Sequence, residues 1–256
     1  LIDANHVPGS SQILVTEKET EYRTLYSGDF SFPGIQTPKA DCLILDPTHG
    51  EPLYDFETRR TDVLEQLFQD IMVSIEKNQS VEIVAHRGTM QEIMRYLQKV
   101  IDGKFIPEKV PFVCVEKEKK LTDALEKYLE TNDNPHEIQV GTDGYLNELH
   151  EQHQPYVLFT RPNQTSNQID RHNVFRIDGF SGFKKLGPYS KRENGTTNIN
   201  YASHSGYCEI LEYVDQVKAE EIVIDGSRGN PQTCLTLSNA ISELGKKCYV
   251  DIYEGT

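Results

Sequence analysis

The 256-residue sequence contains no apolar run that approaches the roughly 20 residues a membrane-spanning helix requires. It also has no visible secretion signal at its start. Its 37% apolar content, 26% charged content and mean hydropathy of -0.56 are typical of a soluble protein. We therefore expect a soluble chain that can bury one large core or two modest ones and that has no membrane partner.

The sequence has no Cys-x-x-Cys pair, and its cysteines are odd in number, widely scattered and mostly embedded in apolar runs. This pattern favours a reducing compartment and predicts a cytoplasmic location. The five cysteines are Cys42, Cys114, Cys208, Cys234 and Cys248.

Basic residues are in short supply: the formal net charge is -14 and the pI is near 5.0. This balance argues against a broadly basic surface that would coat nucleic acid. A polyanionic substrate would therefore need a local positive cleft or a metal ion.

The first thirty residues present a histidine and an aspartate where strands are expected to end. His6 precedes a Pro-Gly turn, and Asp29 follows Ser27-Gly28 after an apolar run. Histidine and aspartate at strand ends are ligand types that build zinc sites. The alternative from spacing alone is that His6 caps a turn and Asp29 belongs to a hairpin.

Further along the chain, segments with strand character alternate with segments whose apolar residues recur at helical spacing. This alternation predicts parallel strands in a sheet covered on both faces. The irregular stretch 161–198 is interpreted as a long functional loop or a domain crossover. The expected strands are 40–45, 81–85, 111–115, 155–160, 198–202, 221–224 and 247–252, and the expected helices are 57–77, 91–100, 119–128, 207–217 and 231–244.

Three of the expected strands are followed by residues that could act as ligands or as acid/base groups: Asp46, His204 and Asp225. Sites in open α/β sheets gather at the carboxyl ends of the strands. Together with His6 and Asp29, these residues predict one shared polar site.

Four segments, in this order and spacing, resemble motifs of the metallo-β-lactamase-fold nucleases of the β-CASP group, the family of cleavage-and-polyadenylation endonucleases and of RNase J. The segments are Asn5-His6-Val7-Pro8-Gly9-Ser10, Tyr26-Ser27-Gly28-Asp29-Phe30, Leu45-Asp46-Pro47-Thr48-His49-Gly50 and Tyr201-Ala202-Ser203-His204-Ser205-Gly206-Tyr207. The resemblance covers essentially the whole chain and is weak between about residues 105 and 195.

The resemblance implies a partial αββα metallo-β-lactamase sandwich with an inserted parallel α/β domain. The metallo-β-lactamase domain would comprise residues 1–50 and 198–256, and the β-CASP domain residues 51–197. The inserted domain would act as a lid, and the cleft between the domains would hold a single strand.

The resemblance also implies two zinc ions, with Asp29 bridging them, His6 binding one of them and Asp225 as a further candidate ligand. Two departures stand beside it. The family's His-x-His-x-Asp-His motif is absent from these residues: either it lies upstream of Leu1, where the sequence starts inside an apparent strand, or this member has lost it. Asp225 also stands where the family usually has histidine or valine, and the alternative is that it forms an Asx-type turn.

His204 would donate to the scissile phosphate or protonate the leaving oxygen, with Asp46 fixing its tautomer. The alternative for His204 is a histidine satisfied within the core. Ser227 and Arg228 are candidate phosphate contacts, and Arg87 opens a helix whose N-terminus could bind phosphate. For that turn, the alternative is a purely structural need for Gly88.

The expected function, provided that the upstream zinc motif exists, is a zinc-dependent phosphodiester hydrolase that processes single-stranded RNA. DNA is a second candidate substrate, and a homodimer is one candidate state of assembly. One alternative is a non-catalytic relative that binds RNA or a protein partner. The other is a hydrolase of a small ester or phosphoester, because the fold hosts many hydrolases.

Overall fold

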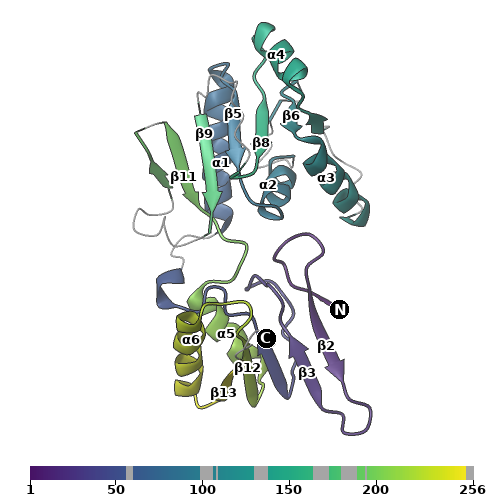
Figure 1. The fold of residues 1–256 in the computed structure, drawn as a ribbon, viewed down its shortest axis with the longest axis vertical. Helices are drawn as coiled ribbons and strands as arrows, with labels where there is room; N and C mark the ends of the chain where they lie inside the picture. The colour runs from purple at the N-terminus through teal and green to yellow at the C-terminus, as the bar shows by residue number, and fades with distance from the viewer. Residues whose placement is uncertain are drawn as a thin grey trace. The chain divides into compact units, whose positions relative to one another are not determined.

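The computed structural model describes residues 1–55, 60–98, 106–107, 109–129, 138–163, 173–179, 189–193 and 195–251 (Figure 1). Two compact units make up the chain: Leu1–Glu57 with Ser203–Thr256 form unit 1, and Thr58–Ala202 form unit 2. The boundaries expected from the sequence, 50/51 and 197/198, fall a few residues before these.

Unit 1 contains a six-stranded sheet whose order is β1-β2-β3-β4-β12-β13. The first two pairings, β1 with β2 and β2 with β3, are antiparallel, whereas β3, β4, β12 and β13 run parallel to one another. The strands are β1 (Ile2–Asp3), β2 (Ser11–Thr16), β3 (Arg23–Tyr26), β4 (Cys42–Leu45), β12 (Glu221–Asp225) and β13 (Lys247–Asp251).

Two helices, α5 (Tyr207–Val217) and α6 (Pro231–Glu243), accompany the parallel part of this sheet, with the short 3-10 helix η1 (Pro52–Tyr54) beside α5 (Figure 1). α5 buries Ile210, Tyr213, Val214 and Val217, the spacing of one helical face. Its N-terminus is capped because the Gly206 N–H donates to Glu209 Oε2 at 2.8 Å. α6 begins with Pro231 after Asn230, whose side chain accepts from the Thr233 N–H.

Aromatic packing defines the core of unit 1. The rings of Phe30 and Tyr213, both fully buried, lie 4.4 Å apart between centroids. The Tyr213 hydroxyl donates to Gln12 Oε1 at 2.6 Å, so the polar end of this buried tyrosine is satisfied. The core therefore joins β2, the loop after β3 and α5.

Unit 2 contains a seven-stranded sheet of order β10-β11-β9-β5-β8-β6-β7, parallel except for the edge pair β10 and β11. Its strands are β5 (Val81–Val84), β6 (Phe112–Cys114), β7 (Ile138–Val140), β8 (Val157–Thr160), β9 (Asn173–Asp178), β10 (Tyr189–Lys191) and β11 (Thr196–Asn200). Its helices are α1 (Arg60–Glu76), α2 (Thr89–Gln98), α3 (Glu116–Leu129) and α4 (Asp143–Glu151).

The predicted mixed α/β class is confirmed, and most of the expected strands and helices are present. The interpretation of 161–198 as one irregular stretch is wrong, because it contains β9, β10 and most of β11. In β9 the side chains alternate, with Phe175 and Ile177 buried on one face. Parts of this stretch, including 180–188, lie outside the described residues.

Within the described residues, none of the helices combines the length and the apolar character that crossing a membrane would require. All five cysteines are described, and none of them forms a disulfide.

Candidate metal and catalytic site

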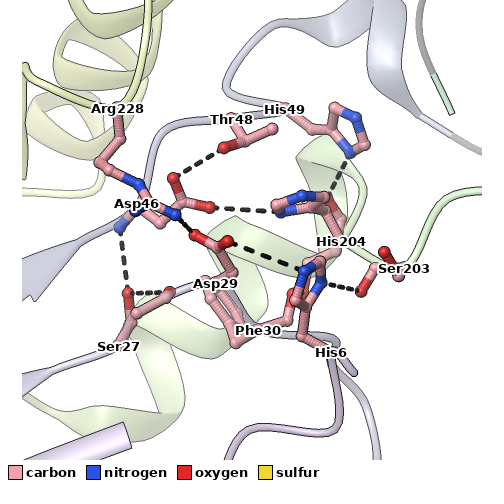
Figure 2. A network of polar contacts seen from close by, with 12 residues as sticks. His6, Ser27, Asp29, Phe30, Asp46, Thr48, His49, Ser203, His204 and Arg228 are labelled. Atoms are coloured by element: carbon pink, nitrogen blue, oxygen red, sulfur yellow. Dashed lines mark hydrogen bonds and ion pairs between the residues drawn. The ribbon is translucent and has the colours of Figure 1, made fainter. Parts of the chain in front are cut away.

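The candidate site of unit 1 lies at the carboxyl ends of adjacent parallel strands (Figure 2). Asp29 follows β3, and Asp46 directly follows β4. His6 follows β1, and His204 comes just before α5. Neighbouring parallel strands end at the same edge of a sheet, so Asp29 and Asp46 converge there. The turn after β1 brings His6 beside Asp29, and the segment before α5 brings His204 beside Asp46.

A tight turn and a long-range hydrogen bond fix His6. The backbone N–H groups of His6 and Val7 donate to Ser10 Oγ at 3.0 and 3.2 Å. His6 Nδ1 lies 3.0 Å from the carbonyl oxygen of Ser203. Because a carbonyl oxygen only accepts, Nδ1 carries the proton, and Nε2 is the nitrogen that could hold a metal ion. Nε2 lies 3.7 Å from Asp29 Oδ2, so this nitrogen faces the carboxylate.

The Asp29 carboxylate faces two cationic or potentially cationic groups. Oδ2 faces His6, and Oδ1 forms an ion pair with Arg228 Nη2 (Figure 2). The preceding Gly28 has a φ of 54°, and a Cβ there would come within 3.3 Å of the Ser11 carbonyl oxygen. Glycine therefore allows the close turn that points Asp29 into the site.

His204 lies beside Asp46, the partner predicted for it. Asp46 Oδ2 lies 3.4 Å from His204 Nδ1, while Asp46 Oδ1 accepts from the Thr48 hydroxyl at 2.7 Å. The Asp46 N–H donates to Ser27 Oγ at 3.0 Å. Asp46 is only 3% exposed, so its carboxylate is held rigidly beside the histidine.

A third histidine, His49, also belongs to the site and was not singled out from the sequence. It is 1% exposed, and its Nδ1 lies 3.1 Å from the Ser205 carbonyl oxygen. Its ring stacks on Tyr54 at 4.6 Å and lies 5.3 Å from the His204 ring between centroids. The sequence signal that could have identified it was its place in the segment after β4, Asp46-Pro47-Thr48-His49-Gly50, where only Asp46 was considered.

Among the residues that the structure describes, His6, Asp29 and His204 form a group whose ligand atoms all lie within 4.8 Å of one another. The His6 and His204 ring centroids are 4.3 Å apart. His204 Nδ1 is buried and makes no hydrogen bond to the described residues. Two imidazoles and a carboxylate suit zinc, and the bond from His6 to Ser203 is the outer support typical of a metal-binding histidine. The residues therefore fit a metal ion.

The predicted ligand Asp225 lies outside this group, and His204 is the third member instead. Asp225 Oδ1 accepts from the Ser227 N–H at 3.1 Å and from its hydroxyl at 2.5 Å, which is the Asx-type turn considered as the alternative. Asp225 Oδ2 accepts from the Tyr26 hydroxyl at 3.2 Å. Burial and the nearby Asp225 charge raise the pKa of Tyr26, so this hydroxyl keeps its proton. Both oxygens of Asp225 are thus engaged within the protein.

The predicted phosphate contacts have different partners and do not all belong to the same unit. Ser227 belongs to the Asp225 turn, and Arg228 pairs with Asp29. Arg87 belongs to unit 2, where its Nε and Nη2 donate to Glu118 at 2.7–3.1 Å. Arg161 Nε also lies 3.1 Å from Glu118 Oε1. Glu118 is fully buried, and its bonds to Arg87 hold its pKa below the ordinary value.

We expect Arg87→Gln to weaken unit 2 most at neutral pH, because it removes hydrogen bonds from a buried carboxylate. The pKa of Glu118 in the folded protein lies below the ordinary 4.5. Its ionised carboxylate therefore stabilises the fold fully above pH 4.5, and this contribution disappears as the pH falls through the folded-state pKa. The difference in urea midpoint between wild type and variant should therefore narrow on acidification.

The matched control is Lys120→Gln, which removes an equal charge from α3 but breaks only an exposed pair with Glu116 at 2.7 Å. It should shift the midpoint little at any pH. If the difference in urea midpoint between wild type and Arg87→Gln stayed constant from pH 7 to pH 3, the assigned role of Glu118 would be contradicted.

Comparison with known proteins gives relatives without an assigned function. No family model matches the sequence. Over 130 residues the chain is 36% identical to the "Uncharacterized protein in lig 3'region" of Acidianus ambivalens. The aligned region covers 50% of this chain and 86% of that protein.

A solved structure, the crystal structure of a protein of unknown function from Enterococcus faecalis V583, matches 99% of this chain with a TM-score of 0.57 and 11% identity. The chain spans 61% of that protein's length. At this identity the likeness shows a shared mixed α/β fold alone.

Proposed function

We propose that this chain, which belongs to the family of the uncharacterized Acidianus ambivalens protein, is a zinc-dependent phosphodiester hydrolase acting on single-stranded RNA. The proposed fold is a partial metallo-β-lactamase sandwich, unit 1, carrying unit 2 as its β-CASP insertion. The observation that carries the proposal is the convergence of His6, Asp29 and His204, with Asp46 behind His204. The four segments that resemble β-CASP motifs each contribute one of these residues, His6, Asp29, Asp46 and His204.

His6 and Asp29 are the proposed zinc ligands, and a second zinc ion remains part of the proposal. Bound zinc would supply charge stabilisation at the phosphoryl oxygens and a water acidic enough to act at neutral pH. The outer contacts of both residues serve this role. Ser203 fixes the tautomer of His6, and the Gly28 turn aims Asp29.

His204 is the proposed proton donor to the leaving oxygen. Asp46 faces Nδ1, so it would hold the proton on that nitrogen and leave Nε2 for transfer. The separation of 3.4 Å is an ion-pair distance rather than a hydrogen bond, and such contacts tighten in many enzymes when substrate binds. Thr48 and Ser27 hold Asp46 in place for this task.

A direct assay tests the function. Purified full-length protein with zinc is incubated with single-stranded RNA, single-stranded DNA and bis(p-nitrophenyl) phosphate, and chelator-treated protein serves as the reference. We expect zinc-dependent cleavage of RNA, weaker cleavage of DNA, and zinc in the protein by elemental analysis. Uncut RNA together with protein that retains no zinc would refute the proposal, and cleavage of only the small ester would favour a small-molecule hydrolase.

The ion pair between Arg228 and Asp29 favours a second candidate function, in which the chain binds RNA without cutting it. In this candidate function the Arg228 guanidinium already occupies Asp29, so the site would hold no metal ion. In that case RNA affinity would be independent of zinc and would fall steeply with salt. DNA binding, a homodimer and a cytoplasmic location also stay predictions.

A further inference from the structure

The turn that follows β12 holds Arg228 beside the candidate metal ligands. The Arg228 N–H donates to the Asp225 carbonyl oxygen at 3.1 Å, and the Asp225 side chain binds Ser227 in the same turn. A Cβ at the next residue, Gly229, would lie 2.8 Å from Pro47 Cγ. Only glycine lets this turn pack against the segment that carries Asp46, so the backbone of Arg228 is fixed close to the site.

The guanidinium of Arg228 meets Asp29, the carboxylate of the candidate metal group. Nη2 of Arg228 pairs with Oδ1, while Oδ2 of the same carboxylate faces His6 Nε2 (Figure 2). Asp29 is therefore shared by the candidate metal position and by an internal cation. The Arg228 side chain is 40% exposed, so it has room to swing toward solvent without disturbing the core.

A metal ion at His6 and Asp29 would stand next to this guanidinium, and two cations repel each other most strongly where water is partly excluded. The Asp29 carboxylate cannot pair fully with the metal ion and with the Arg228 guanidinium at the same time. We infer that Arg228 is the resident counter-ion of Asp29 and competes with the metal ion for it, so that metal binding releases the guanidinium toward an anionic substrate. This inference rests on the proposed metal site and adds a linkage between metal and phosphate binding.

The linkage has a definite sign. A released guanidinium offers planar paired N–H donors that suit a phosphate group. Zinc should therefore strengthen phosphate binding, and by thermodynamic reciprocity phosphate should strengthen zinc binding. Without zinc, Arg228 stays on Asp29 and contributes little to phosphate affinity.

Zinc affinity, measured by competition with a chromophoric chelator, tests the competition without any assay of cleavage. We expect Arg228→Gln to bind zinc about tenfold more tightly than wild type, a gain of the size typical for energetic coupling between sites. The zinc affinity of Arg228→Lys should lie between those of wild type and Arg228→Gln, because a lysine keeps the charge without the planar guanidinium. Asp29→Asn should weaken zinc binding whether or not Arg228 is present.

Arg23→Gln is the matched control. Arg23 starts β3, the strand whose opposite end leads to Asp29, and its removal changes the net charge of unit 1 by the same amount. It should leave zinc affinity unchanged. An equal gain in Arg23→Gln and Arg228→Gln would mean a general charge effect and would overturn the inference.

The second part of the test measures the binding of dimethyl phosphate, a phosphodiester that is not cleaved readily. Binding is detected as line broadening in phosphorus NMR. Wild type should bind it more tightly with zinc than without, and Arg228→Gln should lose most of this difference. If wild type binds zinc and Arg228→Gln binds it equally or more weakly, the inference fails while the proposed function stands. If neither protein binds zinc, both fail.

Discussion

His204→Ala should lower the rate of single-stranded RNA cleavage by roughly 100- to 10,000-fold, the range expected for loss of a general acid. The physical reason is the pairing of His204 Nδ1 with the buried Asp46 carboxylate, which leaves one nitrogen for proton transfer. Rates are measured under single-turnover conditions with excess protein, so that product release does not mask the chemical step.

Metal content separates the two roles that the geometry allows for His204. The residue faces Asp46, yet it also belongs to the group that could hold a metal ion. A proton donor predicts that His204→Ala keeps its zinc, whereas a ligand predicts that zinc is lost together with activity. We expect zinc to be retained, because His6 and Asp29 remain.

Asp46→Asn provides the companion variant. Its amide keeps the size of the side chain but cannot stabilise a protonated His204. Cleavage should fall while the urea midpoint stays near that of wild type, whereas a merely structural role for Asp46 would lower both. A His204→Ala protein as active as wild type would exclude His204 from catalysis.

Phe30→Ala should destabilise unit 1 by about 3–5 kcal/mol, the usual cost of deleting a fully buried aromatic ring. Phe30 is 1% exposed and packs on Tyr213 with ring centroids 4.4 Å apart. The effect should extend to the site, because Phe30 follows Asp29 directly and its carbonyl oxygen accepts from the Ser205 N–H at 2.9 Å. Phe30 thereby joins the segments that carry Asp29 and His204.

Ile241→Ala is the control for the Phe30 prediction. Ile241 is fully buried in the same core, but it lies near the end of α6 and none of its sequence neighbours is a candidate ligand. The Ile241→Ala variant should lose a comparable amount of folding free energy, about 2–5 kcal/mol. Urea unfolding gives the midpoints, and zinc affinity is measured well below them. Equal zinc affinities in the two variants would show that Phe30 does not position the site.

The sequence alone predicted much of the fold because local periodicity reports burial. β12 buries Ile222 and Ile224 in alternation, and α5 buries residues at helical spacing, so both were found close to their observed bounds. β9 was missed, since polar residues at its ends and on one face hide a short alternating strand. The candidate site residues His6, Asp29, Asp46 and His204 were likewise visible as polar groups after strands.

Which of these residues meet was decided by tertiary structure. The order of strands in the sheet places β3, β4 and β12 side by side, and local sequence carries no record of that order. It brings Arg228 onto Asp29, ties Asp225 to Tyr26 and Ser227, and sets His49 against His204. The residue types and their places at strand ends were determined by the sequence. Their partners, and hence whether an acid faces a metal ion or an arginine, depend on long-range packing that local patterns do not encode.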